Sequence, residues 1–137
     1  AIDTQPDPAD ARIAVYRLTG SMFFGAAERV RSDVSAEGDI EVVILAFSQL
    51  RTMDATGANT LGEIVRALER QGVTVLIKGV PSRHMALMRS VGVIDSLRDQ
   101  RHLFDDFPPA LEHARSHVRR NAEARAAQNR AEVVAAR

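Results

Sequence analysis

The sequence predicts an α/β fold: a mixed, mostly parallel sheet of four to five strands flanked by helices. Residues 42–47 read Val-Val-Ile-Leu-Ala-Phe, a continuous apolar run typical of a strand that helices cover on both faces. Strand-like and helix-like segments alternate along the chain, an order that parallel strands joined by helical crossovers produce. The 137 residues fit one domain with a single core.

The first 47 residues contain the patterns of three strands and one helix. Residues 13–18 alternate apolar and polar side chains and predict the first strand, and residues 22–24 predict a second, very short one. Apolar residues at helical spacing follow, and the helix they predict stops at Gly38. Residues 40–47 form the next predicted strand.

An amphipathic pattern then predicts a helix that starts at Thr56 or Gly57 and ends at Arg70. Its apolar residues recur three and four positions apart and so share one face. Gly72 is the predicted left-handed residue after this helix. Residues 73–77 are predicted to form the strand that follows.

The remaining elements are predicted from capping residues and prolines. Ser82 is the expected N-cap of a helix that Gly92 ends. Residues 94–104 are expected to be a weak strand or an extended segment. Pro108 and Pro109 suit the first turn of a last helix.

Composition divides the chain into a linker at residues 1–11, a domain at 12–118 and a basic, Ala/Arg-rich helical tail at 119–137. Residues 1–114 carry 12 Lys and Arg against 16 Asp and Glu, whereas residues 115–137 carry six against two. We expect the tail to be an exposed helix, with a contact to anionic lipid headgroups as the alternative. One tyrosine and no tryptophan argue against nucleic-acid binding.

The absence of cysteine excludes disulfides, thiolate nucleophiles and thiolate metal ligands, as a reducing compartment permits. No apolar run approaches the roughly 18 to 20 residues that cross a bilayer. A soluble, cytoplasmic segment is therefore expected. Because the chain begins at Ala1 with a polar stretch instead of methionine, we expect it to be a piece of a longer protein.

The most informative segment for function is Met-Asp-Ala-Thr-Gly at residues 53–57. It lies where a buried strand passes to a helix, the edge at which α/β folds bind ligands. Thr56 is the predicted N-cap, and a phosphate on its hydroxyl would meet the positive end of the helix dipole. Three roles are open for this segment. In the first, the role is structural: Thr56 caps the helix and Asp54 braces the turn. In the second, Thr56 is a phospho-switch, and in the third, the loop contacts a partner.

No catalytic residue is predicted, because the sequence lacks a recognisable nucleophile, a GxxxxGK[ST] cradle and a GxGxxG loop. No cofactor is predicted either, although weak nucleotide binding stays open. His113 and His117 are four residues apart and could hold one ion together, but no acidic motif such as HExxH accompanies them, so no metal site is predicted. His84 and His102 are expected to be solvated.

Several motifs resemble the STAS domain of SulP-type anion transporters. Residues 16–27 are similar to the opening of that domain, where the first strand runs into a G-x-x-F-F-G-A-A turn. Residues 43–45 followed by 54–57 resemble the family's "vvIL…D-x-[S/T]-G" signature. Residues 75–80 and 91–93 resemble its later strand and helix.

The resemblance implies a cytoplasmic, non-enzymatic regulatory and protein-interaction domain of a secondary anion transporter for sulfate, bicarbonate or dicarboxylates. Implied partners are the membrane domain of the same transporter, a cytoplasmic protein and a second copy of the chain. In the related anti-sigma factor antagonists, the residue before the glycine of D-x-S-G is a phosphorylated serine, a position that Thr56 occupies here. Asp54 and Gly57 would orient this loop. A standalone antagonist acting as a phospho-switch is the alternative function.

Overall fold

The computed structural model describes residues 5–20, 29–30, 32–34, 36 and 38–136. Their sheet contains four strands in the order β1-β2-β3-β4, and each neighbouring pair is parallel. The strands are β1 (Ile13–Gly20), β2 (Val42–Leu50), β3 (Thr74–Lys78) and β4 (Leu103–Phe104). The predicted α/β fold is therefore confirmed. The strand predicted at residues 22–24 lies outside the described residues.

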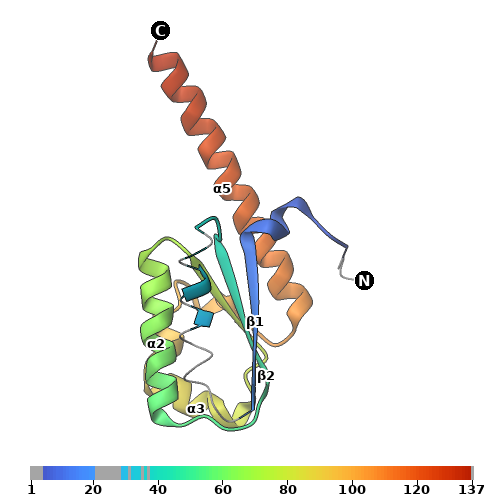
Figure 1. Ribbon diagram of the computed structural model, residues 1–137, viewed down its shortest axis with the longest axis vertical. Coiled ribbons are helices and arrows are strands. Elements are labelled where there is room, and N and C mark those ends of the chain that lie inside the picture. Colours follow the sequence, from blue (N-terminus) through green and yellow to red (C-terminus); the bar gives the residue numbers. More distant parts are fainter. Residues whose placement is uncertain (1–4, 21–28, 31, 35, 37, 137) are drawn as a thin grey trace.

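Helices cover both faces of the sheet (Figure 1). Residues 29–30, 32–34 and 36 are helical, as predicted for this region. The further helical elements are η1 (Pro8–Arg12), α2 (Ala55–Arg70), α3 (Ser82–Ser90), α4 (Val93–Ser96), η2 (Gln100–His102) and α5 (Phe107–Ala135). Helices α2 and α3 lie on one side of the strands, and α5 crosses the other side.

Strand β2 is buried on both faces because its side chains alternate between two apolar clusters. Val43, Leu45 and Phe47 pack in the larger cluster with the apolar stripe of α2. Val42 and Ile44 face the other way and pack in a smaller cluster against the start of α5. The continuous apolar run therefore serves two separate cores.

Three predictions for the segments after β3 differ from the structure. Pro81, not Ser82, is the N-cap of α3, and no side chain caps that helix. Residues 94–104 are not one extended piece, because Ile94 lies in the short helix α4 and only the last two residues form β4. His84 and His102, expected in solvent, are 6% and 4% exposed.

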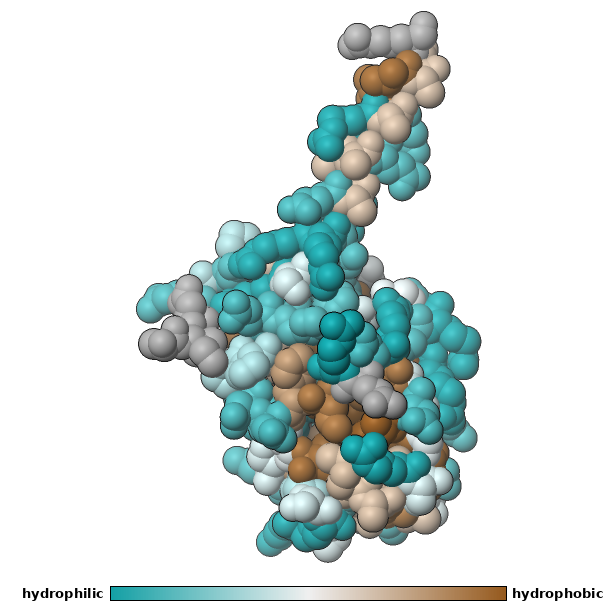
Figure 2. All heavy atoms as spheres, turned by 180° about the vertical axis from the view of Figure 1, so that it is seen from behind, coloured by the Kyte–Doolittle hydropathy of each residue, from teal (hydrophilic) through white to brown (hydrophobic). Residues whose placement is uncertain are grey.

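Helix α5 is a single helix that projects far beyond the body of the domain (Figure 1). Its first turns bury Ala110, Ala114 and Val118 against the sheet, whereas residues 121–136 are all exposed. Hydrophilic side chains alternate with small apolar ones along the projecting part (Figure 2), and two exposed valines, Val133 and Val134, lie near the end of the helix. Residues 119–135 of the predicted tail thus continue the helix of the domain without a break.

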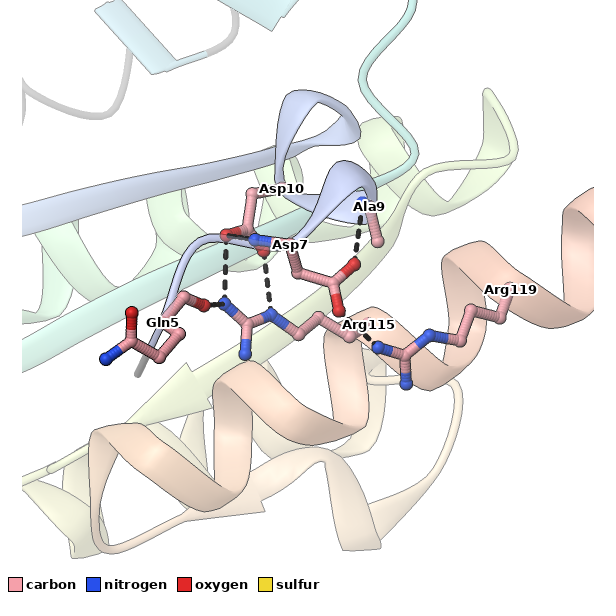
Figure 3. A network of polar contacts seen from close by, with 6 residues as sticks. All are labelled: Gln5, Asp7, Ala9, Asp10, Arg115 and Arg119. Carbon is pink, nitrogen blue, oxygen red and sulfur yellow. Dashed lines mark hydrogen bonds and ion pairs between the residues drawn. The ribbon is translucent and has the colours of Figure 1, made fainter. Parts of the chain in front are cut away.

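The N-terminal segment is fastened to α5 by two arginines (Figure 3). Arg115 is 6% exposed and donates from Nε and Nη2 to the two carboxylate oxygens of Asp10, at 2.8 and 2.9 Å. It also donates to the carbonyl of Gln5 at 2.8 Å, and Arg119 pairs with Asp7. Residues 5–11, which were assigned to a linker from the sequence, therefore pack against the domain. We call these contacts the N-terminal clamp.

Candidate functional site

The loop between β2 and α2, residues 51–54, lies at the carboxyl end of the central strand. Strand β2 continues three residues beyond Phe47 and ends at Leu50, which is fully buried. The carbonyl of Leu50 accepts a hydrogen bond from Arg83 Nη2 at 3.1 Å and lies 3.2 Å from Nε2 of His84, which is hydrogen-bonded to it. Helix α3 thereby supports the start of the loop.

Asp54, not Thr56, is the N-cap of α2. Its backbone is extended, with φ −102° and ψ 172°, and its Oδ1 accepts a 2.7 Å hydrogen bond from the N–H of Gly57. Helix α2 then begins at Ala55, one residue before the earlier of the two predicted starts. Asp54 therefore satisfies an amide of the first turn that would otherwise have no partner within the helix.

Thr56 occupies the second position of α2 and is exposed. Its carbonyl accepts a hydrogen bond from Thr60 Oγ1 at 3.0 Å. Gly57, by contrast, is buried beneath the first turn, and Met53 packs partly against the core. The loop is thus anchored at Met53 and Gly57, and the hydroxyl-bearing residue between them faces outward.

The surroundings of Thr56 favour a negative group. The positive end of the helix dipole lies at this first turn, and Arg51, at the start of the β2–α2 loop, is exposed. An acidic partner side chain or a phosphate on Thr56 would therefore meet a favourable field. Residues 54, 56 and 57 are brought together as the sequence predicted, although their capping roles differ.

The support from Arg83 and His84 was missed by sequence reasoning. Arg83 and His84 match no sequence motif that would predict this contact. The acceptor they share is the backbone carbonyl of Leu50, which is 33 residues from Arg83 and 34 from His84 in the sequence. Histidine 102 was missed for a similar reason. Its place in solvent was inferred from a polar neighbourhood in sequence, whereas tertiary packing buries it.

A tight contact between neighbouring strands restricts the backbone beside the loop. Lys78 Nζ donates to Ser48 Oγ at 2.6 Å. Gly79 follows with a φ of +71°, and a Cβ built there would lie 2.2 Å from Ser48 Oγ. Only glycine fits this position, so the carboxyl ends of β2 and β3 are held in close register.

Within the described part of the chain, no helix has the length and apolar character that crossing a membrane requires.

No curated protein sequence matches the chain. Several solved structures are similar to it. The STAS domain of a SulP transporter from Vibrio cholerae is 28% identical, with a TM-score of 0.71 over 79% of this chain and 84% of that one. A sulfate transporter family protein from Wolinella succinogenes is 30% identical, with a TM-score of 0.68 over 78% and 88%.

A more distant likeness has the same fold. SpoIIAA, a Bacillus cell-fate determinant solved in its phosphorylated form, is 19% identical, with a TM-score of 0.55 over 74% of this chain and 89% of that one. The family model of the STAS domain matches residues 6–109, which include β1 to β4, the β2–α2 loop and the first residues of α5. The chain therefore belongs to the STAS domain family.

Proposed function

We propose that this chain is the cytoplasmic regulatory and protein-interaction domain of a secondary anion transporter of the sulfate, bicarbonate or dicarboxylate type, and that it catalyses no reaction. Two similar structures carry this proposal, since one is the STAS domain of a SulP transporter and the other a sulfate transporter family protein. STAS domains of this kind regulate and do not catalyse.

The observation that supports a docking role is the exposed, rigidly capped first turn of α2. Residues 51–56 are exposed except for Met53, which is partly buried, and the hydrogen bond from the Gly57 N–H to Asp54 Oδ1 caps the turn that contains Thr56. A surface that is already ordered loses little conformational entropy when a partner binds. We propose that the membrane domain of the same transporter contacts the β2–α2 loop together with the first turn of α2, where Thr56 lies.

The test is the association of the chain with that membrane domain, compared for wild type and Thr56→Glu. Stability should hardly change, since an acidic group near a helix N-terminus contributes about 0.3 to 1 kcal/mol in favour of the helix. Association should weaken instead, because a carboxylate enlarges and charges the contact residue. Asn129→Glu is the matched control, as it adds the same charge at an exposed position of α5 and should leave association unchanged.

Loss of several kcal/mol of stability with unaltered association would contradict the docking role of Thr56. It would mean that Thr56 contributes to the stability of the fold and does not contact a partner. The thermal midpoint of each variant, measured beside its binding curve, separates these two results.

A second candidate is a standalone phospho-switch, in which a kinase modifies Thr56. The exposed hydroxyl in the first turn of α2 favours it, since phosphate is stabilised near a helix N-terminus. The gene upstream of Ala1 discriminates between the two candidates: a series of hydrophobic segments supports the transporter, and a start codon near Ile2 supports the switch. A cytoplasmic protein partner and a homodimer remain proposals for either function.

A further inference from the structure

Three histidines from two elements meet beside the first half of α5. His102 ends η2, and His113 and His117 lie one turn apart on α5. Their ring centroids are 4.7 to 5.2 Å from one another. One ring nitrogen from each histidine lies within 4.8 Å of those of the other two. The chain segment before β4 is thereby joined to α5 by a triangle of imidazoles, which we call the histidine cluster.

The spacing within the cluster suits a shared ion. The Nε2 atoms of His113 and His117 are 3.2 Å apart. With zinc–nitrogen bonds of about 2.0 to 2.1 Å, two ligands of a tetrahedral ion lie roughly 3.3 Å apart. The two α5 histidines therefore already stand at ligand separation, and a small movement of the His102 ring, which offers a nitrogen within 4.8 Å of theirs, completes the set.

A second observation comes from His102 itself. The residue is 4% exposed, and its Nδ1 is buried without a hydrogen-bond partner. Buried polar atoms are nearly always satisfied, so an exception points to a ligand. An ion bound by one ring nitrogen also fixes the tautomer and the orientation of the ring.

The environment keeps the imidazoles in the form that binds metal. Burial is the main cause that lowers the pKa of all three histidines, and it brings the pKa of His117 to about 4. For His102 and His117, the charge of His113 is the second cause that lowers the pKa. Neutral imidazole is the ligand form.

The cluster borders an open hollow of about 410 Å³, so an ion can reach it. Asp99 and Arg101 on its rim form an ion pair at 2.8 Å and largely cancel each other's charge. Arg120 also lines the hollow, and its positive charge opposes a cation, which lowers affinity without removing the ligands. The ring centroid of Phe104 lies 5.6 Å from that of His113, with the two planes tilted by 48°, and this contact supports the position of His113.

We propose that His102, His113 and His117 bind one divalent transition-metal ion, with Zn²⁺ as the expected occupant. Imidazole nitrogen suits Zn²⁺, Cu²⁺ and Ni²⁺, whereas Mg²⁺ and Ca²⁺ prefer oxygen ligands. Three protein ligands leave a fourth position for water. The site uses α5, which packs on the face of the sheet opposite α2, so it does not depend on the β2–α2 loop.

The experiment is zinc titration by calorimetry on the full chain purified without a histidine tag. Wild type should bind one Zn²⁺ per chain, and Co²⁺ should give the visible absorption of a tetrahedral site. His113→Gln and His117→Gln should each lower affinity by at least the roughly 10- to 100-fold that loss of an outer-shell partner costs. Glu112→Gln is the matched control, because this exposed neighbour on α5 lies outside the cluster and should leave affinity unchanged.

His102→Gln should lower affinity as well, and its circular dichroism shows whether the buried substitution preserves the fold. If it does not, the two α5 variants carry the test, since their histidines are only partly buried. Unchanged affinity in both α5 variants would overturn the proposal. So would an octahedral Co²⁺ spectrum, or Mg²⁺ competing equally with Zn²⁺.

Discussion

Asp54 determines where α2 begins through one hydrogen bond to the N–H of Gly57. Asp54→Ala removes that acceptor and should destabilise the protein by about 1 kcal/mol, which lowers the thermal midpoint by roughly 3 to 5 °C. Asp54→Asn keeps a side-chain acceptor and should stay close to wild type. Equal midpoints for all three proteins would show that water satisfies this amide equally well.

The choice between Asp54 and Thr56 as cap shows what local sequence leaves open. Aspartate and threonine both favour the N-cap position, and here they are two residues apart. The exit path of β2 decides between them, because the strand continues to Leu50 and leaves room for only three residues before the cap. The sequence pattern therefore located the turn and the exposure of Thr56, but it assigned the N-cap to Thr56 instead of Asp54 and did not indicate that Leu50 and Gly57 are buried.

At the scale of elements, long periodic segments were predictable and short ones were not. Strand β2 and helix α2 each carry a pattern that only one kind of secondary structure satisfies, and both were found within three residues of their ends. The segment from Ile94 to Phe104 is too short for a period to show. Ile94 lies in a four-residue helix, Leu97 is the C-cap of that helix, and the last two residues form a two-residue strand, so tertiary contacts select its structure.

The projecting part of α5 should contribute little to stability. Truncation after Arg120 removes exposed side chains and two surface contacts to Glu41, from Asn121 at 2.8 Å and Arg125 at 3.5 Å. Exposed pairs are worth about 0 to 1 kcal/mol, so the thermal midpoint should fall by less than about 5 °C. Truncation after Arg130 keeps both contacts and serves as the control.

A fall in the midpoint above roughly 8 °C would exceed what about 1 kcal/mol gives a domain of this size. Such a result for truncation after Arg120 but not after Arg130 would assign a structural role to the contacts with Glu41. In both truncations, it would indicate that the tip of α5 packs in a dimer.

At the scale of the whole molecule, the N-terminal clamp should depend on pH. The hydrogen bond from Arg115 is the main cause that holds the pKa of Asp10 below its ordinary value. A carboxyl with a lowered pKa in the folded state contributes stability that is complete above its unfolded pKa and is lost as the pH falls through the folded one. The contribution of Asp10 should thus be complete above about pH 5, begin to decline near pH 4, where the unfolded carboxyl titrates, and be lost only below the lowered pKa of the folded state.

Asp10→Asn measures this contribution by difference. The variant should be less stable than wild type by about 1 kcal/mol at pH 7, a modest value because the Asp10 carboxylate is partly exposed. The gap should narrow as the pH falls towards 3. Chemical denaturation at a series of pH values gives both curves, and Asp39→Asn, at an exposed position, should show no such gap. A gap independent of pH would mean that shape, not charge, holds the clamp.

The clamp also gives the domain an order of assembly in time. Neighbouring strands of the sheet follow one another along the chain, so each new strand can join the sheet soon after it leaves the ribosome. Asp10 and Arg115 are 105 residues apart, and at about 5 to 20 residues per second the aspartate waits roughly 5 to 20 s for its partner. During that interval the N-terminal segment has no helix to hold it, and synthesis of α5 is the event that locks it in place.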